Sequence, residues 1–149
     1  MVRRSTLVHV CAVAALAAAI VFATTAVAIA APAEPTMGLT ALQAKLDASP
    51  AGTIPGYLKP VCEGARIETI PLDVLAITGG ATADSSLILF EANGPGIDKY
   101  GGIVAGMSGS PVYVDDGGID KVIGALSYGD SFTIGGSGLA TPIESEQRD

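Results

Sequence analysis

The fold of this chain is decided by residues 101–113, which read Gly-Gly-Ile-Val-Ala-Gly-Met-Ser-Gly-Ser-Pro-Val-Tyr. The stretch predicts a short strand, a tight glycine-rich turn that presents the Ser108 hydroxyl, and a second strand. Gly106 and Gly109 can adopt backbone angles that other residues avoid, so the chain can turn sharply and direct its N–H groups into one small space. A serine nucleophile needs this arrangement, because amide donors beside its Oγ stabilise the developing oxyanion. A hairpin turn that is merely rich in Gly and Ser is the alternative interpretation.

The spacing around Ser108 separates two families of serine hydrolases. It differs from the Gly-x-Ser-x-Gly elbow of α/β-hydrolases, because residue 110 is Ser and no strand-to-helix pattern follows. It resembles the Gly-x-Ser-Gly-[Gly/Ser]-Pro turn of chymotrypsin-like serine peptidases. Residues 101–111, with Val-Ile-Gly-Ala-Leu-Ser-Tyr at 122–128, closely resemble the SpoIVB-type serine peptidase family. The resemblance covers residues 56–144 and is strongest over 101–128.

This resemblance implies a fold and a role for several residues. The implied fold is mainly β, a partial chymotrypsin-like β-barrel of about six short strands preceded by a signal peptide and one short helix. Ser108 would be the catalytic nucleophile, and the backbone N–H groups of Gly106 and Ser108 would be the oxyanion donors. Ser110 would have a structural role. The implied substrate or ligand is a protein or a peptide.

The general base is the part that the sequence does not supply. His9 is the only histidine, and it lies in the N-terminal apolar segment. Lys99 and Lys121 are near Ser108 in sequence, but neither lies in an apolar stretch that would favour the neutral amine, so neither is expected to replace an imidazole. The position that the resemblance assigns to an aspartate is Asn93 here, a possible orienting residue, and Asp98 would need a different register.

Two explanations are compatible with a peptidase scaffold that lacks a general base. The chain is either an incomplete or split protein, whose base lies in a missing segment or another chain, or a descendant that kept the scaffold and lost hydrolysis. Because an unassisted hydroxyl is a poor nucleophile, we expect weak or no activity from this chain alone. The alternatives are a non-catalytic extracellular peptide- or protein-binding module on the same scaffold, and a structural fragment that does not fold alone.

The N-terminus has the anatomy of an export signal. A short basic start at Arg3 and Arg4 precedes an almost wholly apolar run, residues 6–31, and Ala-Ile-Ala at 28–30 matches a cleavage site. The run is also long enough to span a bilayer uncut. We therefore expect a signal peptide at 1–30, cleaved or retained as a membrane anchor, and a secreted or cell-envelope protein. Residues 31–55 are expected to be a linker with a short helix, and 56–149 the peptidase domain.

Composition excludes several classes of partner. The chain has 15 acidic and 8 basic residues and a net charge of −7, with no basic cluster, so nucleic acid is a poor partner. Cys11 lies in the apolar segment, which leaves Cys62 without an internal disulfide partner and excludes the usual zinc spacings. No cofactor or metal is expected. Asp115, Asp116 and Asp120 lack the EF-hand spacing and are predicted to be a solvated acidic turn.

Local patterns predict the remaining elements. Leu39, Leu42 and Leu46 favour one face of a helix, and Thr40 to Gln43 has the form of a capping box. Alternating or continuous apolar residues predict strands at 66–70, 71–77, 86–92, 111–114, 122–128 and 139–143. A hairpin turn is predicted at 115–118, and residues 144–149 are predicted to fray.

Overall fold

The computed structural model describes residues 34–63, 66–129 and 135–147. These residues belong to one compact unit, residues 34–149, and the unit before it, residues 1–33, lies outside the described part together with the predicted export signal and His9. The strands are β1 (Ile54–Leu58), β2 (Val61–Glu63), β3 (Arg66–Ile67), β4 (Ile70–Gly79), β5 (Ser86–Ala92), β6 (Pro111–Asp115), β7 (Asp120–Gly129) and β8 (Ser137–Pro142). The helices are α2 (Leu39–Ala48), α3 (Pro95–Asp98), α4 (Ile143–Glu146) and a 3-10 turn at Ala83–Ser85. None of the helices in the described ranges is long and apolar enough to cross a membrane.

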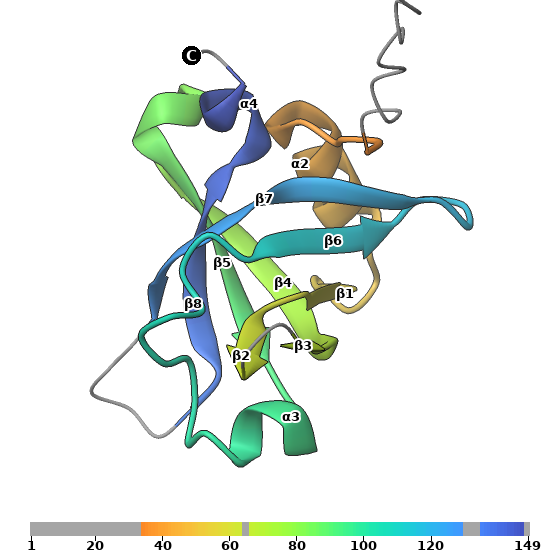
Figure 1. The fold of residues 1–149 in the computed structure, drawn as a ribbon. Coiled ribbons are helices and arrows are strands. Elements are labelled where there is room, and N and C mark those ends of the chain that lie inside the picture. Colours follow the sequence, from red (N-terminus) through yellow and green to blue (C-terminus); the bar gives the residue numbers. More distant parts are fainter. Residues whose placement is uncertain (1–33, 64–65, 130–134, 148–149) are drawn as a thin grey trace, which may run out of the picture. The chain divides into compact units, whose positions relative to one another are not determined.

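Six strands form a closed antiparallel barrel in the order β1-β4-β5-β8-β7-β6, with β6 returning to β1 (Figure 1). Closure leaves none of these six strands as a free outer edge of the sheet. The mainly β class, a barrel of six strands and a preceding helix are therefore confirmed, and the barrel is closed. The strand predicted before the Ser108 turn is wrong, because residues 101–105 form turns and one isolated bridge. β1 is the barrel strand that was not predicted, and Arg66–Ile67 lies outside the barrel. This topology is compatible with a chymotrypsin-like barrel. The short β2 and β3 form a separate two-stranded sheet.

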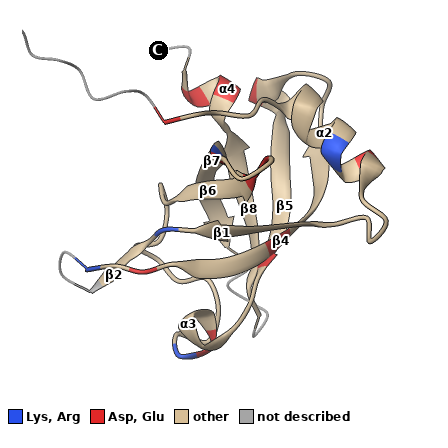
Figure 2. Ribbon diagram, turned by 90° about the vertical axis from the view of Figure 1, so that its right-hand side faces the viewer, with Lys and Arg blue, Asp and Glu red and all other residues tan. Residues whose placement is uncertain are grey.

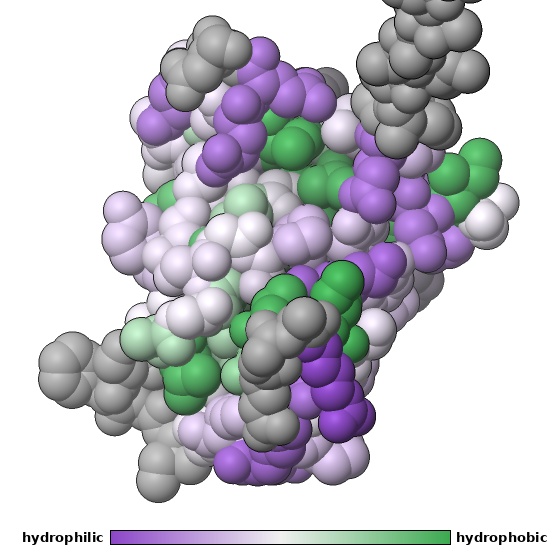
Figure 3. Space-filling model, viewed as in Figure 1, coloured by the Kyte–Doolittle hydropathy of each residue, from purple (hydrophilic) through white to green (hydrophobic). Residues whose placement is uncertain are grey.

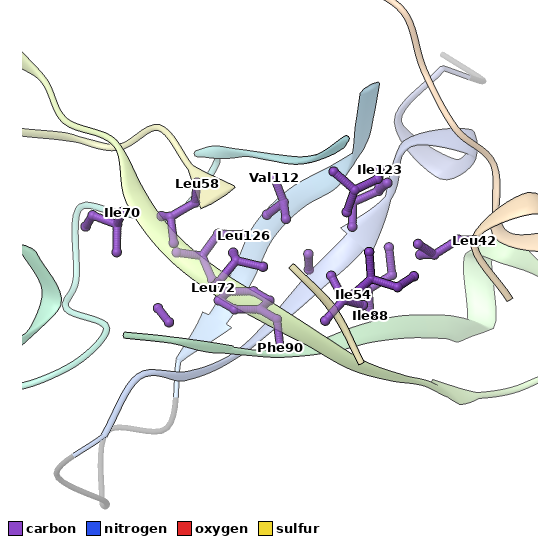
Figure 4. Packing of buried hydrophobic residues seen from close by; sticks show 14 of the residues in the cluster. Leu42, Ile54, Leu58, Ile70, Leu72, Ile88, Phe90, Val112, Ile123 and Leu126 are labelled. Carbon is purple, nitrogen blue, oxygen red and sulfur yellow. The ribbon is translucent and has the colours of Figure 1, made fainter. Parts of the chain in front are cut away.

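Alternation along the strands fills the barrel. In β5 the side chains of Ser86, Ile88, Phe90 and Ala92 are buried, and the residues between them are more exposed. The inward side chains of the other strands meet them in one cluster without a tryptophan (Figure 4). Burial of each large aliphatic side chain contributes roughly 1.5–3 kcal/mol, so this aliphatic core with Phe90 is the main source of stability.

The first helix belongs to the barrel unit. Leu42 and Leu46 are buried on one face of the helix, as their spacing predicted. They also join the barrel's core cluster, although the helix was predicted to lie in a linker. The predicted capping box is wrong, because the helix begins at Leu39 with Gly38 as its N-cap. The Leu39 amide instead donates to Glu144 Oε2 at 3.3 Å. The prediction that the C-terminus frays is also wrong for residues 144–146, because Glu144 lies in α4 and accepts a hydrogen bond from the first residue of α2.

Candidate functional site

The Ser108 loop runs from α3 to β6 and meets β6 at the end opposite the β6–β7 turn (Figure 1). Gly106 and Gly109 have φ angles of 97° and 82°, which confirms the turn geometry predicted for them. The Gly109 amide donates to the Leu126 carbonyl of β7 at 2.7 Å, and the Leu126 amide donates to the Ser110 carbonyl at 2.9 Å. These two bonds tie the end of the loop to the barrel wall.

A buried anchor fixes the middle of the loop. The Met107 side chain is only 1% exposed and packs in the core cluster. Ser110 is 7% exposed, its amide donates to the Met107 carbonyl at 3.1 Å, and its Oγ donates to the same carbonyl at 2.5 Å. Ser110 thus closes the turn from inside, while Ser108 is exposed outside.

The Ser108 hydroxyl and two amides are left without acceptors in the described part of the chain. The Met107 amide donates to the Val104 carbonyl at 3.1 Å and the Gly109 amide is also bonded, whereas the amides of Gly106 and Ser108 donate to no described residue. An unpaired hydroxyl beside two unpaired amides can act as a nucleophile with its oxyanion donors, or can bind a ligand's acceptor atoms.

The loop forms one wall of a shallow hollow of about 190 Å³. Lys59 and Val61, which follow β1, line its other wall. The Lys59 Nζ lies 4.6 Å from the ring centroid of Tyr113 and 5.3 Å from that of Tyr57. Both distances are within the range of cation–π attraction, so the ammonium lies over the two ring faces. The Lys59 side chain that carries it lines the hollow.

The two tyrosines form a rigid platform on neighbouring strands. Tyr57 of β1 and Tyr113 of β6 are register partners, and their rings stack with centroids 4.9 Å apart. The Tyr57 hydroxyl donates to Asp120 Oδ2 and the Tyr113 hydroxyl to Glu34 Oε2, both at 2.7 Å. Burial, followed by the hydrogen bond to Asp120, raises the pKa of Tyr57 to about 12. Burial and the bond to Glu34 raise the pKa of Tyr113 as well.

No imidazole lies in the described residues, because the sequence has only His9. Lys99 forms an ion pair with Glu68 at 2.9 Å, and Lys121 pairs with Asp116 at 2.7 Å, so both ammonium groups have carboxylate partners. The neighbouring Tyr100 hydroxyl, followed by the Glu68 carboxylate, raises the pKa of Lys99, which favours the charged form and opposes a role as base.

Asn93 does not meet the Ser108 loop in the hollow. Its Nδ2 donates to Asp73 Oδ2 at 3.2 Å, and it lines a different cavity of about 410 Å³ together with Asp98 and Glu91. An orienting contact between Asn93 and a base at Ser108 therefore has no support in this geometry.

The three aspartates of the acidic turn each have a partner. Asp116 pairs with Lys45 and Lys121, which lowers the pKa of its carboxyl. Asp115 accepts the Gly118 amide at 2.9 Å, and Asp120 accepts the Tyr57 hydroxyl. In the ranges that the structure covers, no group of three or more His, Cys, Asp or Glu side chains could hold a metal ion. Cys62 is half-buried and has a free thiol.

Comparison of the chain with protein-family models, curated protein sequences and solved structures gave no match. The class is therefore defined by the geometry of the chain itself. It is a closed, six-stranded antiparallel β-barrel that presents a serine hydroxyl on a glycine turn, beside two unpaired amides.

Lys59 is the site residue that sequence reasoning missed. It lies far from Ser108 in the chain and meets it only because β1 pairs with β6, with Leu58 opposite Val112 and the Lys59 amide bonded to the Pro111 carbonyl at 3.2 Å. The alternation of Tyr57 and Lys59 could have placed these two on one face. Nothing local indicated the pairing that brings that face to the serine.

Proposed function

We propose that this chain carries the nucleophile half of an exported, SpoIVB-type serine peptidase, with Ser108 as the nucleophile. One observation carries the proposal. The Ser108 hydroxyl is exposed on a turn between two left-handed glycines, next to the unpaired amides of Gly106 and Ser108. That is the set of groups that acyl transfer requires on the nucleophile side.

In the proposed reaction, Ser108 Oγ attacks the carbonyl carbon of a peptide bond while a base takes its proton. The carbonyl oxygen becomes an oxyanion that accepts from the amides of Gly106 and Ser108. The C–N bond then breaks, the amine leaves with a proton from the base, and the acyl group stays on Oγ. Water releases it in a second step by the same route.

The base must come from outside the described residues, as an imidazole from another chain or from a part of the protein beyond them. Without it, the neutral hydroxyl is a weak nucleophile, so we expect the isolated chain to react slowly. The proposed export signal at residues 1–30 would deliver this chemistry to the cell envelope or to the outside. It would be at the membrane only if that segment is uncleaved.

The test is labelling of the full chain with a fluorophosphonate, followed by mass spectrometry, with and without free imidazole in the buffer. The reagent forms an O–P bond at Ser108 and releases fluoride. We expect slow labelling at Ser108 that added imidazole accelerates at least tenfold, and none in Ser108→Ala. Ser85→Ala, which removes a different exposed serine, serves as the matched control and keeps the label. Folded protein that stays unlabelled with imidazole present would overturn the proposal.

A second function is favoured by the presence of Lys59 in the hollow, where the described residues supply no imidazole. The same loop could hold a peptide without cleaving it, with unpaired amides and the ammonium as donors. Peptide binding that survives Ser108→Ala, in a chain that does not label, would favour this binding module over the peptidase.

A further inference from the structure

Lys59 differs from the other lysines of the chain. Lys45 and Lys121 form ion pairs with Asp116, and Lys99 pairs with Glu68. Lys59 has no carboxylate partner among the residues that the structure covers. In a chain with 15 acidic residues against 8 basic ones, a half-buried lysine without an acidic partner is unexpected, since carboxylates are plentiful.

The ammonium of Lys59 is positioned by rings instead of by a carboxylate. It lies over the stacked faces of Tyr57 and Tyr113, whose hydroxyls are bonded to Asp120 and Glu34. Both carboxylates accept O–H donors, and neither forms an ion pair with the ammonium in the described part of the chain. Ring faces attract a cation but do not neutralise it, so the Lys59 side chain, which lines the hollow, keeps its full positive charge.

The hollow also holds other unpaired hydrogen-bond donors. The amides of Gly106 and Ser108 are unpaired, and the Ser108 hydroxyl is exposed beside them. Val61, which is 49% exposed, adds an apolar side chain to the wall that it shares with Lys59. Other exposed hydrophobic side chains form several separate small areas in the view of Figure 3, and basic residues are scattered singly over the ribbon in Figure 2. The hollow is therefore the place where one cation and several free donors meet.

We propose that this hollow is a carboxylate-binding subsite, in which Lys59 selects peptides that carry a carboxylate next to the group held at Ser108. The inference rests on the proposed role of the Ser108 loop as a peptide site. Lys59 would act as a specificity residue: it contacts the ligand's carboxylate and takes no part in bond making. Hydrogen bonds between charged groups are stronger than neutral ones, and the tyrosine platform has already fixed the ammonium, which lowers the cost of ordering it.

The carboxylate could come from an acidic side chain or from the C-terminus of a peptide, and the test separates the two. The protein is the folded Ser108→Ala chain, so that binding is measured without chemistry. The probes are acetylated six-residue Ala/Gly peptides in three sets. One set has Glu at each position in turn and an amidated C-terminus, a second has Gln in its place, and a third has Gln with a free C-terminal carboxylate. Binding is followed by NMR titration of the amide signals of residues 106 and 109.

We expect at least one carboxylate-bearing peptide to bind about fivefold or more tightly than its matched amide. The set in which the preference appears identifies the source of the carboxylate. In Lys59→Met the preference disappears, in Lys59→Arg it is kept, and in Lys59→Glu it reverses, so that the matched amide binds more tightly than the carboxylate peptide. Lys45→Met is the matched control: it removes one positive charge at the other end of β6, beside Asp116, and keeps the preference.

Equal binding of carboxylate and amide peptides, no binding of any peptide, or a preference that survives Lys59→Met would each overturn the subsite. The result of fluorophosphonate labelling in the wild type does not depend on the result of this peptide-binding test. Labelling of Ser108 without a carboxylate preference would remove only the role of Lys59. A carboxylate preference without labelling would remove the peptidase and keep the binding site.

Discussion

The two ends of β6 make opposite use of polar groups. At its C-terminal end, Asp116 is bonded to both Lys45 and Lys121, and Asp115 accepts the amide of Gly118 in the hairpin turn. At its N-terminal end, Ser108 and Lys59 have no polar side-chain partner in the described residues. Both ends share the same barrel, so folding alone does not explain the difference. Paired groups at one end stabilise the fold, and unpaired donors at the other are available to a ligand.

The strongest test of this difference between the ends of β6 introduces the same backbone strain at each end. Gly106 and Gly117 have φ angles of 97° and 68°, and a Cβ added to either would meet no atom within 4 Å. Alanine at either position therefore costs about 1–2 kcal/mol through its backbone alone. We expect Gly106→Ala to lower imidazole-assisted fluorophosphonate labelling by about tenfold or more, because its strain moves an oxyanion donor. We expect Gly117→Ala to lower stability alone.

Labelling rates and urea unfolding, measured on both variants, check this prediction. Equal labelling by the two variants would mean that the left-handed turn at Gly106 does not serve the chemistry. A loss of labelling in Gly117→Ala would mean that the two ends are coupled through β6. Ser108→Ala, measured in the same urea series, should unfold within about 0.5 kcal/mol of wild type, because its side chain is exposed and unbonded.

Much of the framework that separates these ends could be predicted from local sequence. The strand Ser86–Ala92, the hairpin strands around residues 115–118 and the left-handed glycines follow from alternation and from turn chemistry, which are local. The start of α2 could not be predicted, because Thr40 favours a cap that the distant Glu144 replaces through its bond to the Leu39 amide.

The candidate site could be predicted only in part, for the same reason. The turn at Ser108 is encoded in five consecutive residues, whereas Lys59 reaches it through the pairing of β1 with β6. Pairing between distant strands depends on the closure of the whole barrel, and the sequence of either strand alone does not indicate its partner. Asn93 shows the reverse case, since closeness in sequence to Ser108 did not bring it to the hollow.

The tyrosine platform lies midway along β6, between the two ends. We expect it to have a smaller effect, on stability at alkaline pH. Tyr57 has its pKa raised to about 12, so the folded chain keeps a proton that the unfolded chain releases near pH 10. The contribution to stability is therefore complete below pH 10 and is lost as the pH rises toward 12. We expect the urea midpoint of the wild type to fall over this window and that of Tyr57→Phe to fall less. Parallel falls in the two proteins would contradict the assignment to Tyr57.

The smallest effect is expected at the paired end, from Asp116→Asn. Lys121 and Lys45 lower the pKa of the Asp116 carboxyl below its ordinary value of 3.8, so the folded state holds its charge better than the unfolded state does. The stabilisation is present above the unfolded pKa and is lost as the pH falls through the folded one. We expect the variant to melt slightly below wild type at pH 7, with the difference shrinking in 1 M salt and shrinking as the pH falls below 3.8. Thermal melting at pH 7 and at pH 2 measures this, and a difference of the same size at both pH values would show that packing, rather than charge, holds this end of β6 together.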